Sequence, residues 1–276
     1  MALDAPACRA GQHALGGLAA LLVLAMLAAG GLLWALARTS PGPGSARRPG
    51  RPVRHERALV ASIAVAMLVF AATAFGVAHG GAFLIADREF SGAAHAGLSA
   101  PGLRDFEWIS WLGNGSVLAP LCAAAALALT LRGERGLAIG IVVALGGNGL
   151  LDALLQRVFV RVRPPADGAL QQFHGWSFPS GHAAGAMVAY GFLGYLALRL
   201  LPPRLRAPCL MIAAALVVLV GASRVFINAH YASDVLAGFA SGTAWLLACI
   251  LVIERTRGAP RRGGLNDRPR RPAPSC

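Results

Sequence analysis

The chain has 276 residues, of which 56% are hydrophobic and only 13% are charged, and its mean hydropathy is +0.60. Soluble domains usually contain about 25% charged residues, so this composition argues against a soluble enzyme and indicates an integral membrane protein. The net charge is +13 and every basic residue is arginine. These arginines gather between apolar runs and at the C-terminus, as in the cytoplasmic loops of membrane proteins. We therefore expect no nucleic-acid partner.

Seven apolar segments approach the roughly 20 residues that a membrane-spanning helix needs. They cover about Ala14–Ala37, Ala58–Val77, Ser116–Leu131, Leu137–Leu155, His182–Leu200, Pro208–Phe226 and Ser233–Ile253. The sequence thus predicts an all-α fold, a polytopic membrane helix bundle with a six-helix core over residues 58–253 and one extra N-terminal transmembrane helix within residues 1–37. Cleavage of the first segment as a signal peptide, after Ala35-Leu36-Ala37, is the alternative.

Charge between the segments predicts the topology. Residues 38–57 form a linker rich in Arg, Pro and Gly, with six arginines against one glutamate. Such a linker is expected to be disordered and cytoplasmic, like the basic C-terminal tail, residues 254–276. Counting crossings from the linker places the stretches Asp87–Trp111, Gln156–Gly181 and Asn228–Ala232 outside. The second of these carries three arginines against one aspartate, which the positive-inside rule disfavours and which suggests that these arginines have a function.

Three polar clusters fall on this same membrane face. They are Arg161-Val162-Arg163-Pro164-Pro165, then Phe178-Pro179-Ser180-Gly181-His182, and then Ser223-Arg224 followed by His230 and Asp234. Each has an ordinary structural alternative, such as a turn with a helix cap or a snorkelling helix end. Three clusters in order on one face, however, predict a single pocket.

The residue types in these clusters suit a phosphoryl group. Arginine binds phosphate oxygens in bidentate fashion, and Ser180 and Gly181 open a helix whose N-terminus favours an anion. Asp234 lies four residues after His230, so a helical turn would let its carboxylate fix the imidazole tautomer and leave the other ring nitrogen free to attack. His182 would then supply a proton to the leaving oxygen. No carboxylate cluster suggests a metal, so we expect no metal and no cofactor.

Polar residues also recur within the fourth segment. Asn148, Asp152 and Gln156 are four residues apart and therefore share one helix face. The stripe runs toward the outer end and leads into Arg161 and Arg163. Polar groups in a spanning helix usually face the bundle interior or a water-filled cavity. Hydrogen bonding between helices is the alternative explanation.

The clusters resemble the type 2 phosphatidic acid phosphatase (PAP2) superfamily, whose signature reads Lys-x6-Arg-Pro, Pro-Ser-Gly-His and Ser-Arg-x5-His-x3-Asp. The second part matches Pro179–His182 and the third matches Ser223–Asp234. The resemblance covers about residues 58–253 and implies a phosphatase core with His230 as nucleophile, Asp234 as its partner and His182 as general acid. It also implies that Arg163, Ser180, Gly181 and Arg224 hold the phosphate.

The family implies a metal-independent membrane lipid phosphatase that works through a phosphohistidine, with its site at the outer (periplasmic or extracellular) face of the cell membrane. Its substrates would be lipid phosphates or pyrophosphates, such as phosphatidic acid, phosphatidylglycerophosphate, undecaprenyl pyrophosphate or lipid A phosphates. The first motif departs from the pattern, because Gln156 stands where the family has lysine. Gln156 can still donate a hydrogen bond to phosphate but brings no charge. A lipid phosphotransferase using the same site, or a non-catalytic homologue, remain the alternatives.

Overall fold

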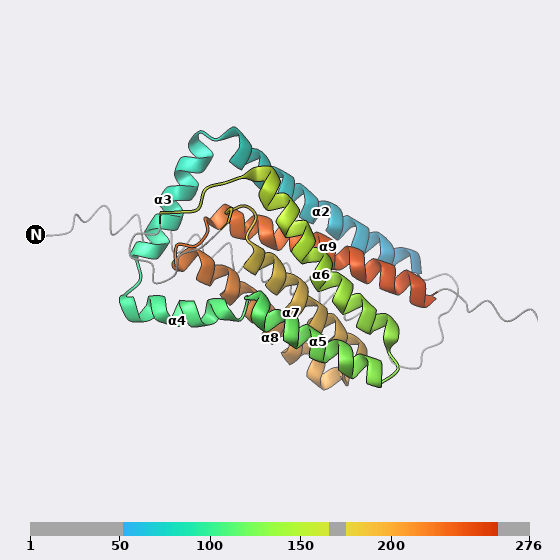
Figure 1. Cartoon of the computed structure of the whole chain (residues 1–276). Helices are drawn as coiled ribbons and strands as arrows, with labels where there is room; N and C mark the ends of the chain where they lie inside the picture. Colours follow the sequence, from blue (N-terminus) through green and yellow to red (C-terminus); the bar gives the residue numbers. More distant parts are fainter. Residues whose placement is uncertain (1–51, 166–174, 259–276) are drawn as a thin grey trace, which may run out of the picture.

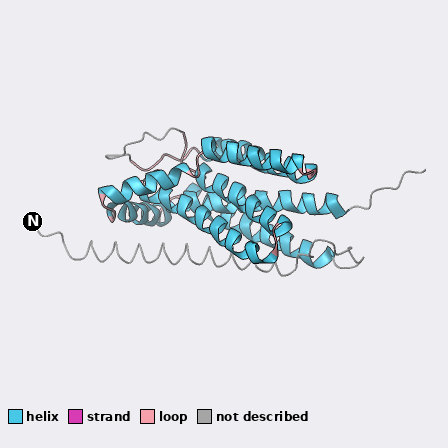
Figure 2. Cartoon of the chain, turned by 90° about the horizontal axis from the view of Figure 1, so that it is seen from below, coloured by secondary structure: helices cyan, strands magenta, loops and turns pink. Residues whose placement is uncertain are grey.

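The computed structural model describes residues 52–165 and 175–258, and within these ranges all regular structure is helical (Figure 2). The helices are α2 (Pro52–His79), α3 (Ala82–Ala96), α4 (Ala100–Trp111), α5 (Gly115–Leu131), α6 (Arg135–Phe159), α7 (Gly181–Leu200), α8 (Pro203–Phe226) and α9 (Ala232–Gly258). The predicted first transmembrane helix, most of the linker and most of the C-terminal tail lie outside the described residues.

Among the described residues, six helical stretches are long and apolar enough to cross a membrane. Five correspond to single helices, namely α2, α6, α7, α8 and α9, and the sixth runs through α4 and α5 as Ala100–Leu131. The six-helix core predicted from the sequence is therefore confirmed. The predicted boundaries agree within about four residues, except that α2 begins six residues and α8 five residues earlier than expected, and α9 ends five residues later.

The stretch Asp87–Trp111, which we expected to be an outside loop, is instead largely helical. It contains most of α3 and all of α4. Ser99 caps α4 by accepting a hydrogen bond from the Gly102 N–H at 3.5 Å, with Pro101 in the first turn, and Asn114 caps α5 through the Ser116 N–H at 3.0 Å. Helices of 15 and 12 residues are too short to span a membrane alone, which is why hydropathy does not detect them.

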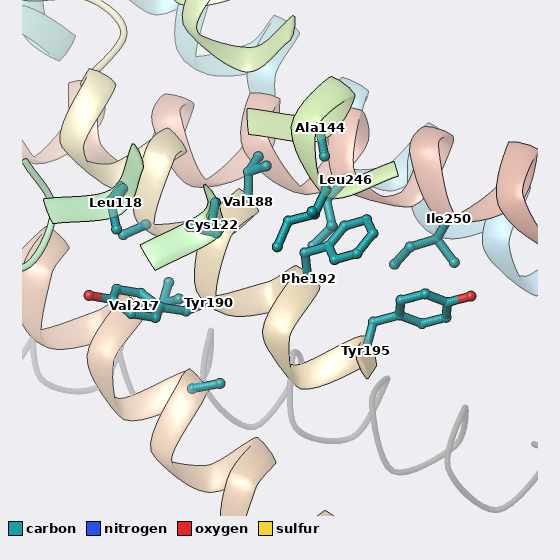
Figure 3. Close-up of a cluster of buried hydrophobic side chains, with 14 of the residues drawn as sticks. Leu118, Cys122, Ala144, Val188, Tyr190, Phe192, Tyr195, Val217, Leu246 and Ile250 are labelled. Atoms are coloured by element: carbon teal, nitrogen blue, oxygen red, sulfur yellow. The ribbon is translucent and has the colours of Figure 1, made fainter. Parts of the chain in front are cut away.

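Helix α7 forms the centre of the bundle. In its most apolar stretch 72% of residues are buried, against 22% for the peripheral α2. Figure 3 shows Phe192 and Tyr195 of α7 among side chains from four other helices, including Cys122 of α5, Ala144 of α6 and Leu246 of α9. Because α7 packs on several sides, its N-terminal end is fixed relative to α6, α8 and α9.

The outer faces of the surrounding helices are strongly apolar. Leu68 of α2 is 69% exposed, Leu150 of α6 is 65% exposed and Met211 of α8 is 71% exposed. Large apolar patches on a protein surface mark contact with a partner or a membrane, and six spanning-length helices identify this partner as the bilayer.

One end of the bundle carries the segments with the predicted site residues. In Figure 1 the chain leaving α6, the start of α7 and the turn between α8 and α9 lie together beside α3, which crosses the ends of the longer helices. Ordered helix ends thus bring residues from distant parts of the sequence to one place.

Candidate active site

The turn between α8 and α9 carries His230 at its base. The N–H groups of Ala229 and His230 both donate to the Arg224 carbonyl, at 3.0 and 3.1 Å, and Asn228 adopts a left-handed conformation with φ of 55°. Asparagine tolerates this conformation better than most residues. The turn leaves the His230 side chain only 1% exposed, so its ring is held inside the protein.

Hydrogen bonds define the tautomer of His230. Its Nδ1 lies 2.8 Å from the Ser177 carbonyl, which can only accept, so Nδ1 carries the proton. Its Nε2 lies 2.9 Å from Nη1 of Arg163, which can only donate, so Nε2 presents a lone pair. The ring therefore carries its proton on Nδ1 and directs the unprotonated Nε2 toward Arg163.

His230 also stays uncharged. Burial lowers its pKa well below the ordinary value, and the nearby cations Arg224 and Arg163 lower it further, against a smaller opposing effect of the Ser177 hydrogen bond. Burial likewise lowers the pKa of Arg163, opposed by Asp234, but arginine starts so high that it remains a cation. The site thus combines a neutral imidazole with positive charge around it.

Asp234 does not make the direct hydrogen bond to His230 that the sequence predicts. Its Oδ2 lies 3.7 Å from His230 Nδ1, because the Ser177 carbonyl takes that N–H. Oδ2 instead accepts from Ser177 Oγ at 2.5 Å and from the Tyr231 N–H at 2.9 Å. The carboxylate therefore supports the imidazole through Ser177, a residue that no sequence motif singled out.

A buried ion-pair network lies behind Asp234. Nη1 of Arg161 contacts Asp234 Oδ1 at 2.6 Å and Nη2 contacts Asp87 Oδ2 at 2.7 Å, with all three side chains at most 8% exposed. Asp87 also accepts from the N–H and Oγ of Ser233, at 3.1 and 2.5 Å. Arg161 further lies over the Tyr231 ring, 4.3 Å from its centroid. Arg161, which belongs to the same sequence cluster as Arg163, thus pairs with two carboxylates.

Arg163 and Arg224 are two cations that lie near His230. Arg163 donates to the carbonyls of Gly175, Trp176 and Ala229 at 2.9–3.1 Å, and these bonds aim its guanidinium at Nε2 of His230. Arg224 is only 3% exposed and donates to Ser110 Oγ of α4 at 2.6 Å. Ser110 lies on α4, outside the three sequence clusters, so no motif predicts it as a partner of Arg224. Both arginines act electrostatically on His230.

The Pro-Ser-Gly-His turn packs tightly against α9. The Ser180 N–H donates to the Asp234 carbonyl at 3.0 Å, so this N–H is not available to an anion as we had expected. A Cβ on Gly238 would lie 2.5 Å from the Ser180 carbonyl, and only glycine permits this approach. Ser180 Oγ is buried and has no hydrogen-bond partner among the described residues. Together with the unpaired N–H groups expected in the first turn of α7, this hydroxyl offers a donor to an anion.

Gln156 and Asp152 lie beneath this turn. Gln156 Nε2 donates to the Pro179 carbonyl at 3.3 Å, and a Cβ on Gly181 would lie 2.8 Å from Asp152 Oδ2. The Gln156 side chain therefore holds the turn by bonding to the turn's backbone. Asn148 and Asp152 are both buried on the same face of α6, which confirms that the polar stripe faces the bundle interior.

His182 is the second residue of α7 and is partly exposed. It interacts electrostatically with Arg224, His230 and Arg163. A Cβ on Gly113 would lie 3.4 Å from its ring, so the loop before α5 closes over one side of it. The structure thus gathers every predicted site residue at one end of the bundle. Within the described residues no group of three or more His, Cys, Asp or Glu side chains is arranged to hold a metal ion.

Comparison with known proteins agrees with this arrangement. The sequence profile of the PAP2 superfamily matches residues 137–257, which include all three clusters. Phosphatidylglycerophosphatase B of Bacillus subtilis (strain 168) is 31% identical over 136 residues, covering 49% of this chain and 66% of that protein. Lipid A 1-phosphatase of Rhizobium johnstonii is 34% identical over 125 residues, covering 39% of this chain and 44% of that protein. The chain thus matches just under two thirds of the first relative and less than half of the second.

A solved structure shares the fold. The crystal structure of a transmembrane PAP2-type phosphatidylglycerolphosphate phosphatase from Bacillus subtilis superposes with a TM-score of 0.64 and 29% sequence identity, covering 70% of this chain and 96% of that one. The agreement extends well beyond the segment matched by the family profile, and it supports an integral membrane protein.

Proposed function

Because the chain belongs to the PAP2 superfamily, we propose that it is a membrane lipid phosphatase that hydrolyses a phosphomonoester or pyrophosphate through a phosphohistidine on His230. The observation that carries this proposal is the hydrogen bonding of His230, whose Nδ1–H is fixed by Ser177 while its Nε2 faces Arg163. A neutral, oriented imidazole beside fixed cations is what nucleophilic attack on a phosphoryl group requires.

Binding would place the phosphate between Arg163 and His230. Nη1 of Arg163 lies 2.9 Å from Nε2 of His230, so a bound phosphate would replace this contact with one between Arg163 and its own oxygens. Arg224, Ser180 Oγ and the N–H of Gly181 would bind the remaining oxygens. Gln156 would act on the phosphate mainly by supporting the Pro179–Gly181 backbone.

In the first step Nε2 attacks phosphorus and the bond to the lipid oxygen breaks. His182 would donate a proton to that oxygen, since the bound anionic phosphate favours a positive charge on its neighbour. The arginines compensate the charge on the transferring group. Asp234 would stabilise the positively charged phosphoimidazole through Ser177.

In the second step water attacks the phosphohistidine. His182, now neutral, would take a proton from that water, and the N–P bond would break to restore His230 and release inorganic phosphate. No step requires a metal, because arginines supply the positive charge.

We place the site at the outer face of the membrane. The opposite end of the bundle carries Arg132 and Arg135 between α5 and α6, and Arg204 and Arg206 at the start of α8. The positive-inside rule assigns that end to the cytoplasm.

Phosphate release in detergent tests the proposal. Purified protein with chelator and no added magnesium should release phosphate from at least one of phosphatidic acid, phosphatidylglycerophosphate, undecaprenyl pyrophosphate and a lipid A phosphate. His230→Ala should abolish both turnover and an acid-labile phosphoenzyme, because it removes the attacking atom. His79→Ala is the matched control, since His79 is exposed and bonds only to the Phe75 carbonyl. An absolute metal requirement, or full activity in His230→Ala, would refute the mechanism.

A further inference from the structure

A groove opens beside the site, between α3 and the chain that leaves α6. It has a volume of about 570 Å³ and is continuous with the site, since Arg161 and Arg163 line both. Leu84, Arg88 and Gly92 of α3 form one wall, residues 161–165 form the other, and Asn228 and Tyr231 lie at its base. Asn228 closes this base by donating to the Pro165 carbonyl at 2.8 Å.

Helix α3 presents two different faces. Asp87 and Ser91, four residues apart, point toward α9, where Asp87 binds Ser233 and Ser91 accepts from the Ala232 N–H at 3.0 Å. Leu84, Arg88 and Gly92 are also four residues apart and therefore share a second face of α3. This second face lines the groove. The first face is used to hold the nucleophile's turn, and the second is open.

The charge in the groove is one-sided. Its described lining holds three arginines and no aspartate or glutamate. Arg161 is neutralised by Asp87 and Asp234, and Arg163 faces His230. Arg88 is exposed and forms no ion pair within the described part of the chain. The groove therefore has one cation beyond those that the reaction uses.

We propose that Arg88 and this groove bind a second phosphate of the substrate, beyond the one that is attacked. This deepens the proposed lipid phosphatase and rests on it. A lipid with a phosphomonoester and a phosphodiester, or with a pyrophosphate, carries such a group, whereas phosphatidic acid does not. Apolar side chains of Val77, Leu84 and Val162 in the lining suit the carbon atoms that accompany the second phosphate.

Selectivity between substrates tests this inference. Arg88→Ala should lower kcat/KM about tenfold for phosphatidylglycerophosphate, undecaprenyl pyrophosphate or both, as expected for loss of one charge-assisted hydrogen bond to the substrate. The kcat/KM for phosphatidic acid should stay within about twofold of the wild-type value, which is the spread expected when no contact to the substrate is lost. Arg88→Lys should retain most of the selectivity. Arg104→Ala, which removes an exposed arginine of α4 away from the groove, is the matched control.

A second variant fills the groove without changing charge. A Cβ on Gly92 meets no atom within 4 Å, so a side chain can start there without a clash, and Gly92→Met should extend it into the groove that Gly92 and Arg88 both line. It should produce the same selective loss. Equal losses of kcat/KM on all three lipids in Arg88→Ala would identify Arg88 as a general bilayer anchor and overturn the inference. Unchanged kcat/KM on all three lipids would overturn it as well.

A binding measurement separates this inference from the proposed function. If the wild-type protein hydrolyses none of the lipids, the proposed function has failed. The affinities for pyrophosphate and for inorganic phosphate then decide whether the groove binds a second phosphate. Arg88→Ala should weaken pyrophosphate binding and leave phosphate binding unchanged. Equal effects on the two ions would refute the second-phosphate site.

Discussion

The two ends of the bundle both carry ion pairs but expose them very differently. At the end with His230, Arg161 pairs with Asp87 and Asp234, and the three side chains are 8%, 6% and 0% exposed. At the opposite end Arg255 pairs with Glu56 and Arg257 with Glu134, and these side chains are 32–59% exposed. Exposed pairs contribute only about 0–1 kcal/mol, whereas buried charges are costly unless fully paired.

This difference shows what each set of charges does. The exposed pairs fasten α9 to α2 and to the α5–α6 connection, where water and salt weaken them. The buried pairs are a poor means of stabilising a bundle, since apolar side chains would serve as well. Their use beside His230 indicates that they orient Asp234, and through it Ser177 and the imidazole.

Removing Arg161 should have the largest effect and tests this comparison most directly. Arg161→Met leaves Asp87 and Asp234 close together, buried and unpaired, which should cost about 3–5 kcal/mol of stability. Phosphate release should fall at least about a hundredfold, by analogy with the loss of one preorganised catalytic group. The melting temperature in detergent and kcat are the measurements.

Two further variants separate orientation from stability. Adding Asp87→Asn to Arg161→Met removes one of the unpaired charges and should restore part of the melting temperature while kcat stays low. Arg161→Lys keeps the charge and should recover part of kcat. Wild-type stability and kcat in Arg161→Met would mean that the buried network is dispensable.

The pH dependence of kcat/KM tests the effect of burial at the His230 end of the bundle, and we expect an effect of intermediate size. Burial and neighbouring cations lower the pKa of His230, so its neutral, nucleophilic form persists as the pH falls. The acid limb of kcat/KM due to the enzyme should therefore lie below the ordinary imidazole value of about 6.5. The measurement is a pH–rate profile from which the separately measured titration of the substrate phosphate is subtracted. An acid limb at or above that value would contradict the effect of burial.

The smallest effect is expected at the opposite end. Arg257→Gln breaks the 2.8 Å contact with Glu134 and should change stability by at most about 1 kcal/mol, with kcat unchanged. Detergent melting at low and high salt measures it, and Arg255→Gln provides a parallel case. A loss comparable to that of Arg161→Met would remove the distinction between the two ends.

Hydropathy and motif spacing predict much of this molecule. Long apolar runs reveal the spanning helices because a bilayer demands them, and the spacing from Ser223 to Asp234 is compatible with the turn that carries His230. Hydropathy does not predict helices α3 and α4, because they are short and of mixed polarity. Helix α4 is capped by Ser99 and packs against α8, while α3 has no side-chain N-cap and packs against α8 and α9.

The finer arrangement of the site depends on three-dimensional contacts. Four-residue spacing places Asp234 near His230, but only the fold reveals that the Ser177 carbonyl takes the imidazole N–H. Arg161 and Arg163 look equivalent in sequence, yet one binds two carboxylates and the other faces His230. The sequence predicts that Gln156 contacts phosphate, whereas the structure shows its Nε2 donating to the Pro179 carbonyl.

The hydrogen bond from Ser180 to the Asp234 carbonyl has a consequence for biosynthesis. Domains of a nascent chain form from the N-terminus onward, and Asp234 belongs to α9, the final helix of the described chain. Until α9 enters the membrane, the α7 turn lacks its acceptor and Arg161 lacks one of its two carboxylates. On the proposed mechanism, a partly synthesised chain without α9 should be unable to form the phosphohistidine, and the site is complete only once this final helix of the described chain is in place.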